Sequence, residues 1–83
     1  MQLELLTPAK NIFSGDIKLV KLPGSSGSFE VMNNHAPIIS ALTEGDLKIE
    51  TSSGETLRYT ISGGVVEVKN NHVIILAESI VNN

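Results

Sequence analysis

Apolar and polar residues alternate along most of the chain with the period of two that is typical of β-strands. The clearest case is 46–50, where Leu47 and Ile49 share one face and three charged residues share the other. The segment 57–61 repeats this alternation, and Ser52-Ser53-Gly54 between the two segments supplies a glycine for a tight turn. These residues predict a β-hairpin with one buried face and one wet face.

A second turn is predicted at Asn70-Asn71, because asparagine tolerates the left-handed backbone of a two-residue turn. Alternating valines precede this turn, and the run Val73-Ile74-Ile75-Leu76-Ala77 follows it. Since this run is apolar on both faces, we expect a central strand that is covered on both sides.

The remaining segments are shorter or less regular. Residues 2–6 alternate, 12–13 predict a short strand before Ser14-Gly15, and an apolar stretch runs from Pro37 to about Leu42. Within 16–22 the apolar phase changes, which is typical of a bulge or of a strand that crosses between sheets. The last residues, 78–81, could add one helical turn. The pattern predicts an all-β sandwich or barrel of roughly nine short strands.

Composition limits what such a domain can do. With 83 residues we expect a single domain over 1–83, and without cysteine it has neither disulfides nor thiolate metal sites. A net charge of -3 with scattered basic residues argues against nucleic-acid binding. No apolar run approaches the length of a membrane span, and the N-terminus does not resemble a signal peptide. We therefore expect a cytosolic chain that only a partner would hold at a membrane.

The search for reactive groups finds no catalytic, metal-binding or cofactor-binding set. Gly24-Ser25-Ser26-Gly27 lacks the lysine of a phosphate-binding loop, so it is interpreted as a surface turn. His35 and His72 are the only imidazoles, and neither has a metal-ligand spacing. The residues alone thus indicate a soluble all-β interaction module. A free-standing sandwich that binds a peptide or carbohydrate stays open, although the chain has no tryptophan; a small hydrolase is disfavoured by the missing nucleophile.

Three stretches resemble the epsilon subunits of F-type ATP synthases in order and spacing. They are LPGSSGSFEV at 22–31, HAPIISAL at 35–42 with GDLKI at 45–49, and SGGVVEV at 62–68 with NHVIILAE at 71–78. Thr7-Pro8 and Phe13-Ser14-Gly15 also resemble that family. The combination of His-Ala-Pro with Ser-Gly-Gly is more specific than any single glycine motif.

This resemblance implies a flattened two-sheet β-sandwich of about nine to ten strands. It also implies a non-catalytic rotor subunit of the central stalk, which links the gamma subunit to the membrane c-ring and couples proton flow to ATP synthesis. Such a subunit is peripheral, on the cytoplasmic side of the bacterial inner membrane. By resemblance, the contacts with the c-ring are Gly27, Ser28, Phe29 and Glu30. The corresponding contacts with gamma are His35, Ala36, Ile38 and Ser40.

The chain departs from the family at three places. Relatives often carry an acidic residue where Ser28 stands, and because side chains alternate along a strand we expect Glu30 to supply that charge on the same face. Asn33-Asn34 replaces a common Pro-Gly turn. In longer members, a helical hairpin that can bind ATP or inhibit hydrolysis follows the equivalent of residue 78. The 83 residues of this chain do not include that hairpin, so no nucleotide binding is expected of them.

Overall fold

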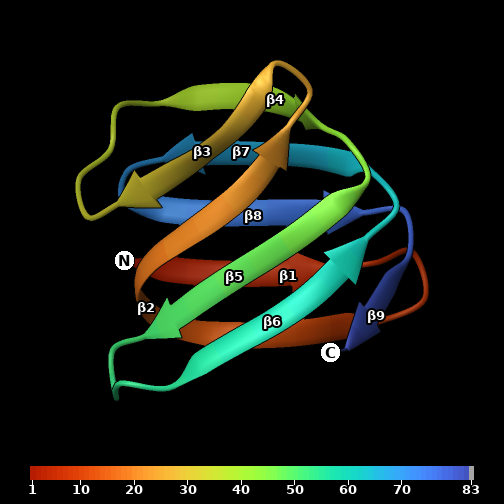
Figure 1. Cartoon of the computed structure of the whole chain (residues 1–83). Coiled ribbons are helices and arrows are strands. Elements are labelled where there is room, and N and C mark those ends of the chain that lie inside the picture. The colour runs from red at the N-terminus through yellow and green to blue at the C-terminus, as the bar shows by residue number, and fades with distance from the viewer. Residues whose placement is uncertain (83) are drawn as a thin grey trace.

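This computed structural model describes residues 1–82, which contain nine β-strands and no helix. Short turns connect the strands (Figure 1). The all-β prediction is therefore confirmed. In chain order the strands are β1 (Gln2–Leu6), β2 (Asn11–Gly24), β3 (Gly27–Met32), β4 (Ile38–Leu42), β5 (Gly45–Thr51), β6 (Thr56–Ile61), β7 (Gly64–Lys69), β8 (His72–Ala77) and β9 (Ile80–Asn82).

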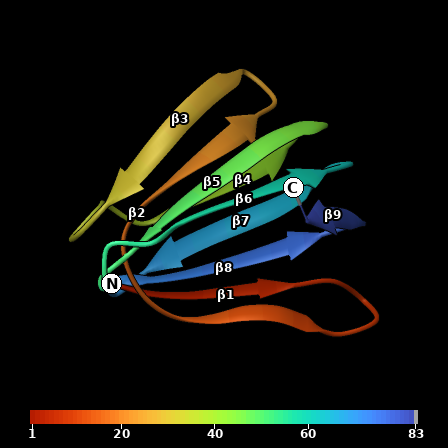
Figure 2. The same cartoon turned by 60° about the horizontal axis from the view of Figure 1, so that its bottom comes forward.

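The strands form two facing layers, which Figures 1 and 2 show from two directions. The first layer contains β4, β7, β8, β1 and the first half of β2. The second layer contains β3, the second half of β2, β5, β6 and β9. Within the described strands, β1 and β8 form a parallel pair and the other pairs are antiparallel. The two-sheet sandwich that the resemblance implied is confirmed.

β2 joins the two layers because it is long enough to take part in both. Its residues up to Asp16 pair with β1, whereas its residues from Leu19 onward pair with β3 and β5. The register with β5 shifts between Ile17 and Leu19, so the predicted bulge and crossing are confirmed. The separate short strand expected at 12–13 is wrong, since the ladder with β1 passes through Ser14 and Gly15 without a break.

Alternation along the strands fills the space between the layers with aliphatic side chains. Tyr59 is the one aromatic member of the buried core found in the described residues. The core residues are Leu3, Leu5, Ile17, Val20, Leu22, Val31, Leu42, Leu47, Ile49, Tyr59, Ile61, Val66, Val68, Val73, Ile75 and Ala77. The hairpin of β5 and β6 has the expected buried face, and Gly54 in its turn has a φ of 96°.

Two expectations about the C-terminal part are wrong. β8 lies between β1 and β7, yet only its inner face is covered, because Leu76 on the outer face is 48% exposed. The segment expected to add a helical turn instead forms β9, in which Ile80 and Val81 pair with Ile61 and Thr60 of β6. Pairing with the free edge of β6 satisfies backbone groups that a single helical turn would leave unpaired.

Gly64 at the start of β7 fits a position that a larger residue cannot occupy. A Cβ atom there would collide with the backbone oxygen of Leu76 and lie 3.0 Å from the Cα of Ala77. Its φ of 155° is also one that other residues rarely adopt. Gly64 therefore lets β7 and β8 approach closely where their pairing begins.

Candidate functional site

The loop between β3 and β4, residues 33–37, carries two of the residues that the resemblance assigns to gamma. The backbone N–H of His35 donates to the carbonyl of Met32 at 3.1 Å, and its Nδ1 lies 2.7 Å from the carbonyl of Ala36. Ala36 is exposed and His35 is half-buried. The loop thus presents a small apolar residue and an imidazole whose orientation a local hydrogen bond fixes.

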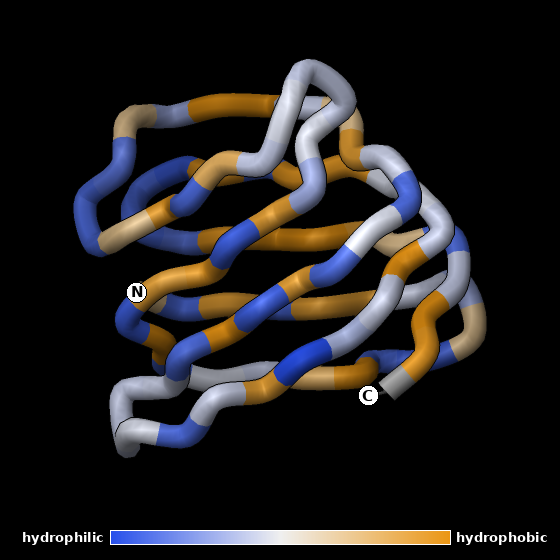
Figure 3. Tube along the Cα trace, in the orientation of Figure 1, coloured by the Kyte–Doolittle hydropathy of each residue, from blue (hydrophilic) through white to orange (hydrophobic). Residues whose placement is uncertain are grey.

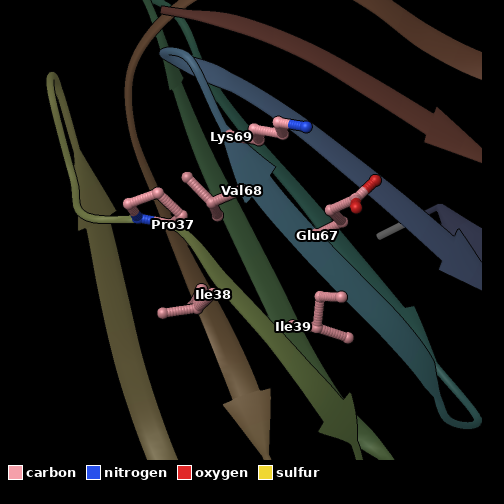
Figure 4. Close-up of a pocket in the computed structure, with 6 residues that line it drawn as sticks. All are labelled: Pro37, Ile38, Ile39, Glu67, Val68 and Lys69. Atoms are coloured by element: carbon pink, nitrogen blue, oxygen red, sulfur yellow. The ribbon is translucent and has the colours of Figure 1, made fainter.

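β4 continues from this loop, and its side chains point alternately to the two sides of the first layer. Ile38 and Ser40 are half-buried, and Ile38 packs against the core opposite Val68. Ile39 lies opposite Glu67 and is 74% exposed. In Figure 4 the side chains of Ile38 and Ile39 extend to opposite sides of the strand.

The hollow that Figure 4 shows at the start of β4 has a volume of about 440 Å³. It is lined by Pro37, Ile38, Ile39, Glu67, Val68 and Lys69. Most of this lining is aliphatic, with one cation and one carboxylate at its rim. The hollow can accept an apolar side chain from a partner, but it offers no pair of groups for acid–base chemistry.

The outer face of the first layer carries a row of apolar side chains across four strands. Ala41 of β4 pairs with Val65 of β7, Val65 pairs with Leu76 of β8, and Leu76 pairs with Leu6 of β1. In a neighbouring row on the same face, Ile39 of β4 and Ile74 of β8 lie on either side of Glu67 of β7. Six residues, Leu6, Ile39, Ala41, Val65, Ile74 and Leu76, are called the outer apolar patch below.

Sequence reasoning missed this patch, although the chain contains a signal for it. Adjacent apolar residues, such as Ile38 with Ile39 and the run 73–77, break strict alternation and must place apolar side chains on both faces of a strand. The run 73–77 by itself predicts a strand that is covered on both sides. A strand whose apolar outer face is left exposed in the isolated chain would have the same sequence pattern.

The hairpin of β2 and β3 carries the residues expected to contact the c-ring. Gly27, Ser28 and Glu30 are exposed, Phe29 is half-buried and Val31 is buried. Ser28 and Glu30 therefore share the outer face, and this part of the prediction is confirmed. The turn of this hairpin contains Gly24-Ser25-Ser26-Gly27, which the sequence also assigned to a turn.

The outer face of the second layer is charged, in contrast to the outer apolar patch. Glu30 pairs with Lys21, Lys21 with Lys48, and Lys48 with Arg58, so one row of four strands carries four charges. Lys48 also forms an ion pair with Glu50 at 3.3 Å. Figure 3 shows the difference: hydrophilic and apolar residues alternate along β5, whereas β8 is apolar over most of its length. The two faces of the sandwich therefore suit different surroundings.

Two contacts between titratable groups involve residues at or near the start of β1. The ammonium group of Met1 lies 3.0 Å from Asp16 Oδ1, and the Ser52 hydroxyl donates to Asp16 Oδ2 at 2.7 Å. The hydrogen bond from Ser52, followed by that from the ammonium group, lowers the pKa of Asp16 below its ordinary value of 3.8. Nearby, His72 Nε2 lies 3.0 Å from Glu4 Oε2.

Neither of these contacts is part of a larger ligand set. Across residues 1–82, no three His, Cys, Asp or Glu side chains gather in a way that could hold a metal ion. The same residues include no helix with the length and apolar character needed to cross a membrane.

Comparison with known proteins identifies the family. The family described as "ATP synthase, Delta/Epsilon chain, beta-sandwich domain" matches residues 1–83. The ATP synthase epsilon chain of Pelotomaculum thermopropionicum is 37% identical over 78 residues, which are 94% of this chain and 58% of that protein. The epsilon chain of Chlorobaculum tepidum is 38% identical over 94% of this chain and 89% of its own length. The chain thus spans less than two thirds of some relatives and most of others.

Solved structures agree on the fold. A chain in the cryo-EM structure of Euglena gracilis mitochondrial ATP synthase, "OSCP/F1/c-ring in rotational state 1", has a TM-score of 0.88 at 24% identity, covering 96% of this chain and 51% of that one. A chain from the Tetrahymena thermophila "central stalk/cring" structure has a TM-score of 0.81 at 23% identity, covering 99% and 66%. These likenesses show the fold. The match over residues 1–83 leads to the conclusion that the chain belongs to the ATP synthase delta/epsilon chain family, as its β-sandwich domain.

Proposed function

We propose that this chain is a non-catalytic part of the rotating central stalk of an ATP synthase. In this role it binds the gamma subunit through the outer apolar patch and the 33–37 loop, and it touches the c-ring through the β2–β3 hairpin. It thereby helps to couple proton flow to ATP synthesis, on the cytoplasmic side of a bacterial membrane. The relatives named ATP synthase epsilon chain support this proposal.

The observation that carries the proposal is the outer apolar patch on β4, β7, β8 and β1. Its large exposed members, Ile39 and Leu76, are 74% and 48% accessible. A monomer gains nothing by leaving such a patch in water, since burying each isoleucine or leucine side chain is worth about 1.5–3 kcal/mol. A partner with an apolar surface, such as a stalk subunit, would gain that free energy on docking.

We assign the gamma contact to His35, Ala36 and the outward residues of β4. Ile38 and Ser40, which the resemblance suggested, lie on the same strand but on its inner side. Their outward neighbours, Ile39 and Ala41, continue the surface from the loop into the outer apolar patch. The hollow beside Pro37 and Ile39 offers a recess for an apolar side chain of gamma.

The c-ring contact is assigned to the exposed side of the β2–β3 hairpin, with Glu30 as its acidic group. Ser28 and Glu30 are exposed there and point the same way. Lys21, the cross-strand neighbour of Glu30, lies within the same row of charges. A polar contact of this kind suits a surface that docks on polar loops without burying much area.

The alternative of a free-standing carbohydrate-binding or peptide-binding module is not favoured. Such sites use exposed aromatic rings. The three aromatic residues of this chain are Phe13 and Phe29, which are half-buried, and Tyr59, which is 6% exposed. We also propose that the domain binds no nucleotide, because its glycine-rich turn carries no lysine to reach a phosphate.

A co-purification experiment tests the proposed function. The tagged chain is expressed with the gamma subunit of the same ATP synthase, and a complex of the two in equal amounts is the expected result. Ile39→Asp should release gamma, because it places a charge in the contact. Val81→Asp is the matched control, since Val81 is a similarly exposed apolar residue on the second layer, at 63%. A folded wild-type chain that elutes without gamma would contradict the proposal.

A further inference from the structure

A side chain in the β7–β8 turn holds the loop between β3 and β4. The Oδ1 atom of Asn71 accepts a hydrogen bond from the backbone N–H of Asn34 at 2.8 Å. The Nδ2 group of the same side chain donates to Oδ1 of Asn33 at 2.9 Å. One amide therefore uses both its acceptor and its donor to connect two segments that lie 37 and 38 positions apart in the sequence.

The backbone of the 33–37 loop and that of the Asn70-Asn71 turn are arranged so that these hydrogen bonds can form. Asn34, Asn70 and Asn71 all have left-handed φ angles, of 63°, 53° and 60°. Asparagine tolerates this conformation better than most residues, and Asn71 in addition carries an amide that reaches the facing loop. The turn at Asn70-Asn71 belongs to the first layer, whereas β3 before the loop belongs to the second. The Asn71 amide thus fixes the connection between the two layers.

The remaining hydrogen bonds of the loop are local. His35 bonds to Met32 through its backbone and to Ala36 through its ring. Within the described residues, the bonds that tie 33–37 to a distant element are therefore those of Asn71. The loop runs directly into β4, which pairs with β7 from Ile38 onward. Within the loop itself, the Asn71 amide is what fixes Asn33 and Asn34 against the β7–β8 turn.

We propose that Asn71 is a positioning residue for the docking of gamma. It holds His35 and Ala36 in a fixed place beside Ile39, so that the loop and the outer apolar patch form one rigid surface. This inference rests on the proposed function, since it concerns the same contact. A loop that is already ordered loses less conformational entropy on binding, and Asn71 therefore raises the affinity without touching gamma itself.

The test compares Asn71→Gly with Asn70→Gly in the 83-residue chain. Glycine accepts the left-handed φ at both positions, so neither variant strains the turn. Both variants also keep the backbone bond from the Gln2 N–H to the carbonyl of residue 71. Only Asn71→Gly removes the amide that bonds to the loop. Asn33→Ala, which removes one of its two partners, serves as an independent second variant.

Two quantities are measured, amide hydrogen exchange at residues 34–36 in the free chain and the affinity for gamma. We expect Asn71→Gly to speed exchange of the Asn34 amide and to weaken gamma binding, each by roughly two- to tenfold, as for the loss of one or two exposed hydrogen bonds. Asn33→Ala should change both in the same direction but less, and Asn70→Gly should change neither.

Unchanged exchange in Asn71→Gly would overturn the proposal, and so would faster exchange with unchanged affinity. Equal effects of Asn70→Gly and Asn71→Gly would also overturn it, because the turn and not the amide would then be responsible. A wild-type chain that does not bind gamma would overturn the proposed function as well. That failure is recognised because it shows in the wild type, not as a difference between variants.

Discussion

Ile38 and Ile39 are neighbours on β4 but belong to different environments. Ile38 lies opposite Val68 and packs against the core, while Ile39 lies opposite Glu67 with 74% of its surface exposed. The two residues have the same side chain and lie on the same strand. They therefore separate what this strand does for stability from what it does for binding.

Replacing each of these isoleucines by aspartate should affect the free energy of unfolding to very different extents. Ile38→Asp should lower the free energy of unfolding by roughly 2 kcal/mol or more, because it removes packed methyl groups and places a carboxylate at the edge of the core. Ile39→Asp should change it by no more than about 0.5 kcal/mol, as is usual for exposed positions. Urea denaturation followed by circular dichroism measures both values, and equal losses would contradict the assignment of the two faces.

Asp16 should make the stability depend on acidic pH. Its pKa is lowered in the folded chain by the Ser52 hydroxyl and the Met1 ammonium group, so its ionised form stabilises the fold. This stabilisation is complete above the unfolded value of 3.8 and is lost as pH falls through the lower folded pKa. Melting temperatures from about pH 7 to about pH 2 should therefore differ between wild type and Asp16→Asn at neutral pH and converge in acid. A constant difference at all pH values would be inconsistent with this origin.

Gly64→Ala should destabilise the domain because the new methyl group meets the backbone of β8. We expect a loss of roughly 1–3 kcal/mol from this clash. Gly54→Ala is a suitable control, since Gly54 also has a positive φ, of 96°, but nothing lies within 4 Å of its added Cβ. The control should lose only the backbone term, about 1–2 kcal/mol. Thermal unfolding distinguishes the two, and a smaller loss for Gly64→Ala than for Gly54→Ala would refute the close approach.

Cysteine at position 28 or 30 should form a disulfide with a cysteine placed in the polar loop of a c subunit. Both side chains point outward from the β2–β3 hairpin. Glu30→Lys should weaken the coupling of proton flow to ATP synthesis without abolishing it, because an exposed ion pair is worth under about 1 kcal/mol. Cysteine at position 31 is the negative control, since Val31 is buried. If neither 28 nor 30 cross-links in an assembled enzyme, the c-ring contact lies elsewhere.

Much of the fold could be predicted from the sequence, because local chemistry determines it. Strict alternation identified the hairpin of β5 and β6, and two asparagines identified the turn before β8. Pairing over long distances could not be predicted. Nothing local shows that β2 runs unbroken from Asn11 to Gly24, or that β9 pairs with β6. These features depend on which strand edges are free after the rest of the sandwich has formed.

The candidate site was only partly predictable, for a related reason. The outward side of Ser28 and Glu30 follows from alternation alone. The outer apolar patch does not, since Leu6, Val65 and Leu76 become neighbours only through pairing between β1, β8 and β7. The Asn71 amide is likewise visible only in three dimensions, because it connects two turns that the sequence separates.

The central claim, that the outer apolar patch faces gamma, is tested most directly by thiol labelling. The chain has no cysteine, so Ile39→Cys and Arg58→Cys each introduce a single reactive group, one on each outer face. The rate of maleimide labelling is measured with and without the gamma subunit. The account predicts that gamma strongly slows labelling at position 39 and leaves position 58 unchanged. Protection at position 58 with free labelling at position 39, in a complex that has formed, would contradict it.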